Sequence, residues 1–167
     1  DEARHDQALE GCFQAFCNNN ANITQDAQSI INRWIELDAH PIVKAAVLEN
    51  GVFFVVLPLF NLYGTPTLRE TSQWISRDEV LHVQSHRKAS EMIGVKPTRA
   101  LDNLRKETVE WIVHYLDDEL GVKGKKDKWM KASDKLMCNG TSDLNETKFA
   151  IKPAFFEINK TTLNTYA

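Results

Sequence analysis

The stretch Thr67–Ile93, TLRETSQWISRDEVLHVQSHRKASEMI, decides the fold class of this chain. Its pattern is that of one long amphipathic helix, and Gly94 follows it in the place of a helix C-cap. Within it, Glu79 and His82 are three residues apart. Positions i and i+3 are neighbours on a helix surface, so this helix is predicted to present a carboxylate and an imidazole on one face.

Short loops separate this helix from further segments with a helical pattern. They are residues 1–18, a segment capped by Thr24 or Asp26, Pro41–Phe60, Pro97–Leu120 and Trp129–Cys138. The third of these contains Pro58, which removes a backbone donor, so we expect its helix to be distorted there. Four or five long helices with short connections make a helical bundle, and the predicted fold class is all-α.

Residues 1–138 are expected to form this bundle as one domain, followed by a mostly irregular segment, residues 139–167. A chain of 167 residues, 43% hydrophobic and 26% charged, is long enough for one compact core and ordinary for a soluble protein. The net charge of −3 argues against a nucleic-acid partner, because proteins that bind nucleic acids usually carry a basic surplus.

The cysteines and the apolar runs favour a cytoplasmic protein. The three cysteines form no Cys-x-x-Cys pair, which argues against a disulfide framework or a thiolate zinc site and favours a reducing compartment. The longest apolar run, Gly51–Phe60, is too short to cross a bilayer. We therefore expect no membrane contact and a cytoplasmic location.

A second Glu-x-x-His motif, Glu2-Ala-Arg-His5, lies at the start of the chain, also in a segment predicted to be helical. A third carboxylate, Glu49, lies in the most apolar predicted helix, where a charge is costly unless it is paired or binds a metal. Bundles that hold two metal ions use two Glu-x-x-His helices and one glutamate from each of two further helices. The pattern therefore predicts a carboxylate-bridged dinuclear site for iron or manganese.

One ligand of such a site is missing from the sequence. A fourth helix should supply a carboxylate, and only Asp1 precedes Glu2. We expect that donor upstream of this sequence, so that the chain would be the C-terminal part of a longer protein. The opposite interpretation is that the two Glu-x-x-His motifs coincide by chance.

Segments in two parts of the sequence resemble a known protein family. Glu49-Asn-Gly-Val-Phe-Phe54, followed by Ile75-Ser-Arg-Asp-Glu-Val-Leu-His82, is similar to consecutive ligand helices of class I ribonucleotide reductase small subunits. Near the end, Phe155-Phe156-Glu157 and Tyr166 resemble the segment that lies shortly before that family's mobile docking tail. The resemblance implies a ferritin-like helical bundle, incomplete here because its N-terminal helices are missing.

The resemblance also implies a role for each site residue. The metal ligands would be Glu2, His5, Glu49, Glu79 and His82. Asp78 would hydrogen-bond a ligand histidine and pass a proton with an electron, as ligand histidines usually donate their other ring nitrogen to a carboxylate. Phe53 and Leu57 would line an apolar pocket beside the metals. A solvent-facing charge is the alternative for Asp78, and plain core packing is the alternative for the two apolar residues.

Leu9 departs from the family pattern. In most of the family, a tyrosine that carries the stable radical lies four residues after the first ligand histidine, which is His5 here. Leucine cannot form a phenoxyl radical, so the chain resembles the subclass that keeps the oxidising equivalent on the metals. The expected cofactor is a di-iron or a manganese–iron pair.

His86 lies four residues after His82 and could bind a metal from the same helix face. Glu79 already completes the expected Glu-x-x-His pair. We therefore expect His86 to be a surface histidine.

The resemblance implies an activity as well. The chain would be the small subunit of ribonucleoside-diphosphate reductase, an oxidoreductase of deoxyribonucleotide synthesis, and would form a homodimer that joins the large subunit. This part alone is expected to be inactive, because it lacks one ligand-bearing helix. Two alternatives stay open: a ferritin-like di-iron oxidase or monooxygenase that acts on a small apolar molecule, and a degenerate, non-catalytic helical subunit.

Overall fold

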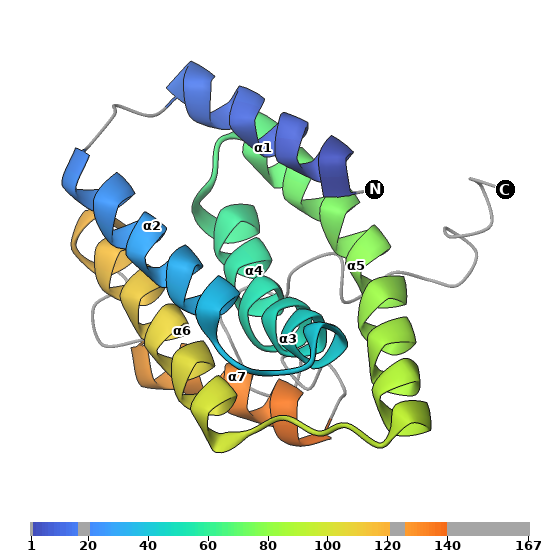
Figure 1. Ribbon diagram of the computed structural model, residues 1–167. Coiled ribbons are helices and arrows are strands. Elements are labelled where there is room, and N and C mark those ends of the chain that lie inside the picture. Colours follow the sequence, from blue (N-terminus) through green and yellow to red (C-terminus); the bar gives the residue numbers. More distant parts are fainter. Residues whose placement is uncertain (1, 17–20, 121–125, 140–167) are drawn as a thin grey trace, which may run out of the picture.

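The computed structural model describes residues 2–16, 21–120 and 126–139, and every regular element within these ranges is a helix (Figure 1). The helices are α1 Glu2–Phe16, α2 Ala21–Glu36, α3 Pro41–Leu48, the π-helical turn η1 Glu49–Phe53, α4 Phe54–Tyr63, α5 Pro66–Ile93, α6 Arg99–Leu120 and α7 Lys126–Asn139. The predicted all-α fold class is thereby confirmed. The predictions for residues 140–167, including Phe155-Phe156-Glu157 and Tyr166, lie outside the described residues.

Helix α5 is the predicted long helix, and its ends follow from its sequence. Thr65 accepts a hydrogen bond from the Leu68 backbone N–H over 3.3 Å, and Pro66 occupies the first turn, where its missing N–H costs nothing. The helix ends at Gly94, whose φ of 72° is accessible to glycine without strain. This continuous element of 28 residues can therefore hold side chains at a regular spacing along one face.

Three predicted helix starts were wrong by a few residues. Helix α7 begins at Lys126 rather than at Trp129. Helix α2 begins at Ala21, before both of the caps proposed for it, Thr24 and Asp26. Helix α6 begins at Arg99, and Thr98 rather than Pro97 marks its start, since the Thr98 hydroxyl accepts from the Leu101 backbone N–H over 3.2 Å.

The predicted distortion of the central helix exists, but it precedes Pro58, which lies inside α4. The widened turn is η1, where the Phe54 N–H bonds back to the Glu49 carbonyl, five residues earlier. A π-helical turn of this kind leaves backbone carbonyls without a regular helical partner. The buried Ser133 hydroxyl of α7 donates to the Gly51 carbonyl over 2.5 Å and so stabilises the turn from outside.

A buried ionic network supports that serine. Arg105 of α6 is 1% exposed and donates to Ser133 as well as to two carboxylates, Asp102 at 2.7 Å and Asp134 at 2.6 Å. Buried charges are tolerated when they are paired and hydrogen-bonded in this way. The network thus joins α6 and α7 to the widened turn of the central helix.

The central helix, α3–η1–α4, packs against α5, and η1 and α4 also contact α6 and α7 (Figure 1). Helix α1 lies along α5, and α2 lies beside α6. The main core combines apolar side chains of α4, α5, α6 and α7 around Val55, Val109 and Val113, all fully buried. Two segments far apart in sequence, α1 and α5, are thereby placed side by side.

The helical stretch Pro41–Tyr63 is, by length and composition alone, apolar enough to cross a membrane. The sequence argument against a membrane span considered only the run Gly51–Phe60 and not the whole predicted helix, Pro41–Phe60. Most of its apolar window is buried inside the protein, and it carries the buried carboxylate of Glu49. Both features are those of a core helix.

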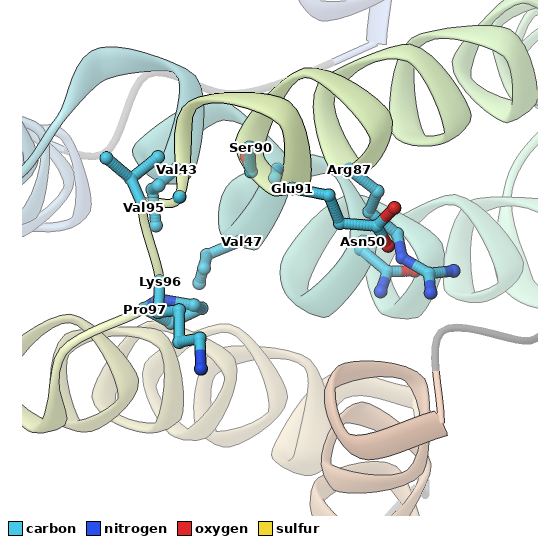
Figure 2. A pocket seen from close by; sticks show the side chains of 11 residues that line it. Val43, Val47, Asn50, Arg87, Ser90, Glu91, Val95, Lys96 and Pro97 are labelled. Atoms are coloured by element: carbon cyan, nitrogen blue, oxygen red, sulfur yellow. The ribbon is translucent and has the colours of Figure 1, made fainter.

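A pocket of about 380 Å³ lies between the central helix and the C-terminal end of α5 (Figure 2). Its floor includes Val43 and Val47, and Val95 closes one side. Asn50 and Arg87 lie at the other end, each directly following a residue of the site described below.

Candidate metal centre

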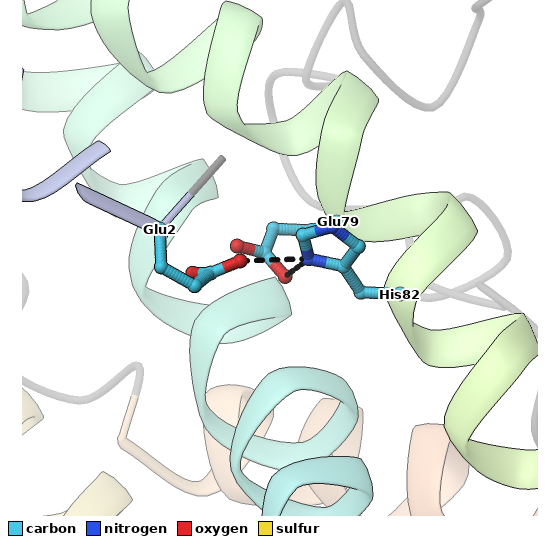
Figure 3. A group of neighbouring side chains, drawn as sticks. All are labelled: Glu2, Glu79 and His82. Carbon is cyan, nitrogen blue, oxygen red and sulfur yellow. Dashed lines mark ion pairs between the residues drawn. The ribbon is translucent and has the colours of Figure 1, made fainter. Parts of the chain in front are cut away.

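The two Glu-x-x-His motifs face each other across α1 and α5. The His82 Nδ1 atom lies 3.0 Å from Glu2 and 3.4 Å from Glu79, two carboxylates that come from different helices (Figure 3). One ligand atom from each of these three residues lies within 4.8 Å of the others. The pairing of the two motifs, predicted from their spacing alone, is therefore present in the structure.

Glu79 is the most deeply buried charge of this cluster, with a side-chain exposure of 0%, against 65% for Glu2. Neither of its carboxylate oxygens accepts a hydrogen bond from any described residue. Burial, followed by the nearby charges of Glu2 and Glu49, raises the pKa of Glu79 to about 7. A buried carboxylate with two unused oxygens is costly unless a proton or a cation compensates it.

His5 has the orientation of a metal ligand. Its Nε2 atom lies 3.0 Å from the Asp78 carboxylate, and a hydrogen bond there makes Nε2 the protonated nitrogen. In the neutral imidazole the Nδ1 atom then carries the lone pair, and it lies 3.4 Å from Glu79 and 3.6 Å from Glu2. This Nδ1 atom is buried and has no hydrogen-bond partner among the described residues. Asp78 thus contacts a histidine of the cluster from the neighbouring helix.

The distances within the cluster fit the coordination of metal ions, with His82 and His5 facing different oxygens of Glu79. Two ligand atoms that each lie about 2.1 Å from one ion are roughly 3.0–3.4 Å apart. The nitrogen–oxygen distances between His82 and Glu2, His82 and Glu79, and His5 and Glu79 are 3.0, 3.4 and 3.4 Å. The Glu79 oxygens and the His5 Nδ1 atom have no hydrogen-bond partner among the described residues and are therefore open to a metal ion. Imidazole and carboxylate donors suit iron and manganese. The residues present therefore fit a metal centre.

Glu49 is brought close to this cluster but has a different partner. It is buried in η1, and one of its oxygens, Oε2, lies 2.6 Å from Nδ1 of His86. Burial is the main cause that raises its pKa, and the hydrogen bond and charge of His86 and the charge of His82 partly offset this increase. Its charge in turn raises the pKa of Glu79, so the two carboxylates lie within electrostatic reach of each other.

His86 was expected to be a surface histidine, and this prediction was wrong. Its side chain is 29% exposed, and it binds the buried Glu49 across the two packed helices. The ring centroids of His82 and His86 are 6.4 Å apart, so α5 presents two imidazoles to the site on successive turns. The spacing of four residues places His86 on the same helix face as His82 and could have indicated this role. We instead expected a surface position, because Glu79 and His82 already formed the expected Glu-x-x-His pair.

The three predicted apolar site residues, Leu9, Phe53 and Leu57, line one cavity of about 320 Å³ beside the cluster. Glu2, His5 and Glu79 line the same cavity. Leu9 and Phe53 are partly buried and pack against the main core, to which the buried Leu57 belongs. The structure therefore places an aliphatic side chain, and no phenol, at the position predicted to replace the radical tyrosine.

Comparisons of the chain with protein-family models, with curated proteins and with solved structures find no match. The case for a function therefore depends on the geometry of the cluster and on the sequence resemblance.

Proposed function

We propose that this chain is part of a ferritin-like metalloprotein and holds a dinuclear iron or manganese–iron centre between α1, η1 and α5. The observation that carries the proposal is Glu79: a fully buried carboxylate, between His5 and His82, with two oxygens that no described residue satisfies. Such an arrangement is stable when a cation replaces the missing donors.

The residues of the chain have distinct tasks in this centre. Glu2, His5, Glu79 and His82 would hold the metal ions, with Glu49 as the fifth ligand. Asp78 fixes the ring orientation of His5 and can take or return a proton at the His5 Nε2 atom, which lies 3.0 Å away. A bound metal pair would supply the one-electron oxidation chemistry that carboxylate–histidine sites perform with iron or manganese.

The biological role that we propose is that of a ribonucleotide reductase small subunit. The support is the order Glu49…Phe54, Ile75…His82 and the agreement of the Asp78–His5 contact with the role that the resemblance gives to Asp78. Leu9 favours a centre that stores the oxidising equivalent on the metals. Partnership with a large subunit and assembly as a homodimer belong to the same proposal.

The apolar cavity beside the cluster supports a second candidate function. Apart from Glu2, His5, Asp6 and Glu79, its lining is apolar: Leu9, Phe53, Val56, Leu57, Phe60 and Ile75. A cavity of about 320 Å³ falls within the usual size range of sites for small ligands. An oxidase that acts on a small apolar molecule would need a space of this kind.

Metal binding is the first test of both candidates. The full-length gene product is incubated without oxygen with Fe²⁺, with Mn²⁺ or with both, desalted, exposed to oxygen, and examined by elemental analysis and electron paramagnetic resonance. About two metal ions per chain and a metal-centred signal are expected. The matched control is Glu79→Gln, which keeps the shape of the side chain, removes its charge and should lose the metals. Equal metal content in both proteins would contradict the proposal.

A binding experiment separates the two roles. Oxygen consumption that a small apolar compound accelerates would favour the oxidase. A defined complex with a ribonucleotide reductase large subunit would favour the reductase.

A further inference from the structure

The contact between His86 and Glu49 is much shorter than the two contacts that Glu79 makes with histidines. The His86 Nδ1 atom lies 2.6 Å from Glu49 Oε2, which is the distance of a strong hydrogen bond involving a charged group. The contacts of Glu79 with His5 and His82 are both 3.4 Å long, and the Glu79 oxygens accept no hydrogen bond from the described residues. A direct hydrogen bond therefore accounts for the first contact, whereas the Glu79 oxygens lack a donor among the described residues and stay open to a cation.

The position of His86 suits a residue that acts through Glu49. It lies one helical turn beyond His82 on α5, and its ring faces η1. Its backbone carbonyl accepts a hydrogen bond from the Ser90 hydroxyl over 2.7 Å. The Nδ1–H of His86 can occupy only one oxygen of Glu49, so the other oxygen remains available to a metal ion.

We propose that His86 is a positioning residue, which holds Oε2 of Glu49 and thereby directs Oε1 of the same carboxylate toward the metal pair. The inference rests on the proposed metal centre and adds to it a histidine that neither Glu-x-x-His motif contains. His86 itself would not bind the metal. Outer-shell hydrogen bonds of this kind commonly change metal affinity by about 10–100-fold.

Two substitutions separate positioning from direct coordination. His86→Ala removes the donor, whereas His86→Asn keeps an N–H close to the position of Nδ1. We expect His86→Ala to weaken Mn²⁺ binding by at least about tenfold and His86→Asn to restore most of the loss. Circular dichroism of all variants checks that the helical content is unchanged.

A double-mutant cycle and a count of bound nitrogens complete the test. In the Glu49→Ala background, His86→Ala should cause no further loss of Mn²⁺ affinity, because its effect passes through that carboxylate. Electron spin echo spectroscopy of the Mn²⁺-loaded proteins should show the same number of coordinated imidazole nitrogens in wild type and in His86→Ala.

The possible outcomes are distinct. A lost nitrogen signal, or an equal loss of affinity with and without Glu49, would make His86 a ligand and overturn the inference. Normal Mn²⁺ binding by His86→Ala would overturn it as well, while the metal centre itself would stand. Wild-type protein that binds neither Mn²⁺ nor Fe²⁺ would instead overturn the proposed function, together with everything inferred from it.

Discussion

His5 and Asp78 are joined across α1 and α5 by a contact of 3.0 Å between Nε2 and Oδ2. The contact leaves the Nδ1 atom of His5 facing the Glu79 carboxylate, 3.4 Å away. Orientation of the His5 ring therefore depends on a carboxylate from another helix, although Asp78 itself is 44% exposed.

Removal of that carboxylate should weaken the centre without unfolding the protein. We expect Asp78→Ala to lower metal affinity by about 10–100-fold, because His5 loses the partner that fixes its ring. Competition with a metal indicator measures the change. Glu70→Ala is the matched control, since Glu70 is an exposed carboxylate two turns earlier on α5, and its removal should leave the affinity unchanged. Equal losses in the two variants would mean that only the net charge matters.

The pH dependence of stability should reverse when metal is added. The pKa of Glu79 is raised from 4.5 to about 7, so the metal-free folded protein keeps a proton that the unfolded chain releases. Its free energy of unfolding should therefore fall as pH rises from about 4.5 to 7, by up to about 3 kcal/mol at about 1.4 kcal/mol per pKa unit. With excess metal, which competes with that proton, stability should rise over the same range.

Thermal unfolding at several pH values, with chelator and with metal, measures both slopes. Glu79→Gln is the control, because it cannot titrate and should flatten the metal-free slope across this range. A metal-free protein that becomes more stable from pH 5 to 7 would show that Glu79 does not determine the pH dependence of the free energy of unfolding in this range.

A tyrosine at position 9 should change where the oxidising equivalent resides. Leu9 lines the cavity of about 320 Å³ that also contains His5 and Glu79, so a phenol ring there would lie beside the metals. We expect Leu9→Tyr, loaded with iron and exposed to oxygen, to give a tyrosyl radical signal that the wild type lacks. Electron paramagnetic resonance detects it, and Leu9→Phe controls for ring size. A tyrosyl signal in the wild type would place the radical on another residue.

The buried network around Arg105 should stabilise the fold strongly. Arg105→Ala removes hydrogen bonds to Asp102, Asp134 and Ser133, and we expect a loss of about 2–3 kcal/mol in the free energy of unfolding. Denaturant unfolding measures it. The control is Lys106→Ala, which breaks a 2.9 Å pair with Asp102 on the surface and should cost under about 1 kcal/mol. Similar losses in both variants would mean that burial adds nothing to the network.

The sequence predicted the parts of this structure that depend on local pattern. Helix α5 and its end at Gly94 follow from residues that are neighbours in the chain. The Glu-x-x-His spacing predicted which side chains share a face, and the structure brings the two motifs together. These features require only helical geometry and one packed interface between α1 and α5.

Features that depend on contacts between distant residues were missed. The widened turn at Glu49–Phe53 is stabilised by a hydrogen bond from Ser133 to the Gly51 carbonyl. The two residues are 82 positions apart, so no local sequence pattern predicts this bond. The pairing of His86 with Glu49 likewise joins residues 37 positions apart. Both depend on how α5 and α7 pack against the central helix, which periodicity alone does not determine.

The extra residue held in η1 also keeps the two halves of the central helix in phase. Val47 and Val55 are both fully buried, although eight residues in a regular α-helix would turn them about 80° apart. If the widened turn takes up one extra residue, Val47 and Val55 are related like residues seven positions apart in a regular helix. Their side chains then point in directions that differ by only about 20° around the helix axis. Loss of one residue at Gly51 would thus leave the two apolar faces in phase and remove the carbonyl to which Ser133 donates. The apolar face of this helix and its widened turn are separable by a single codon.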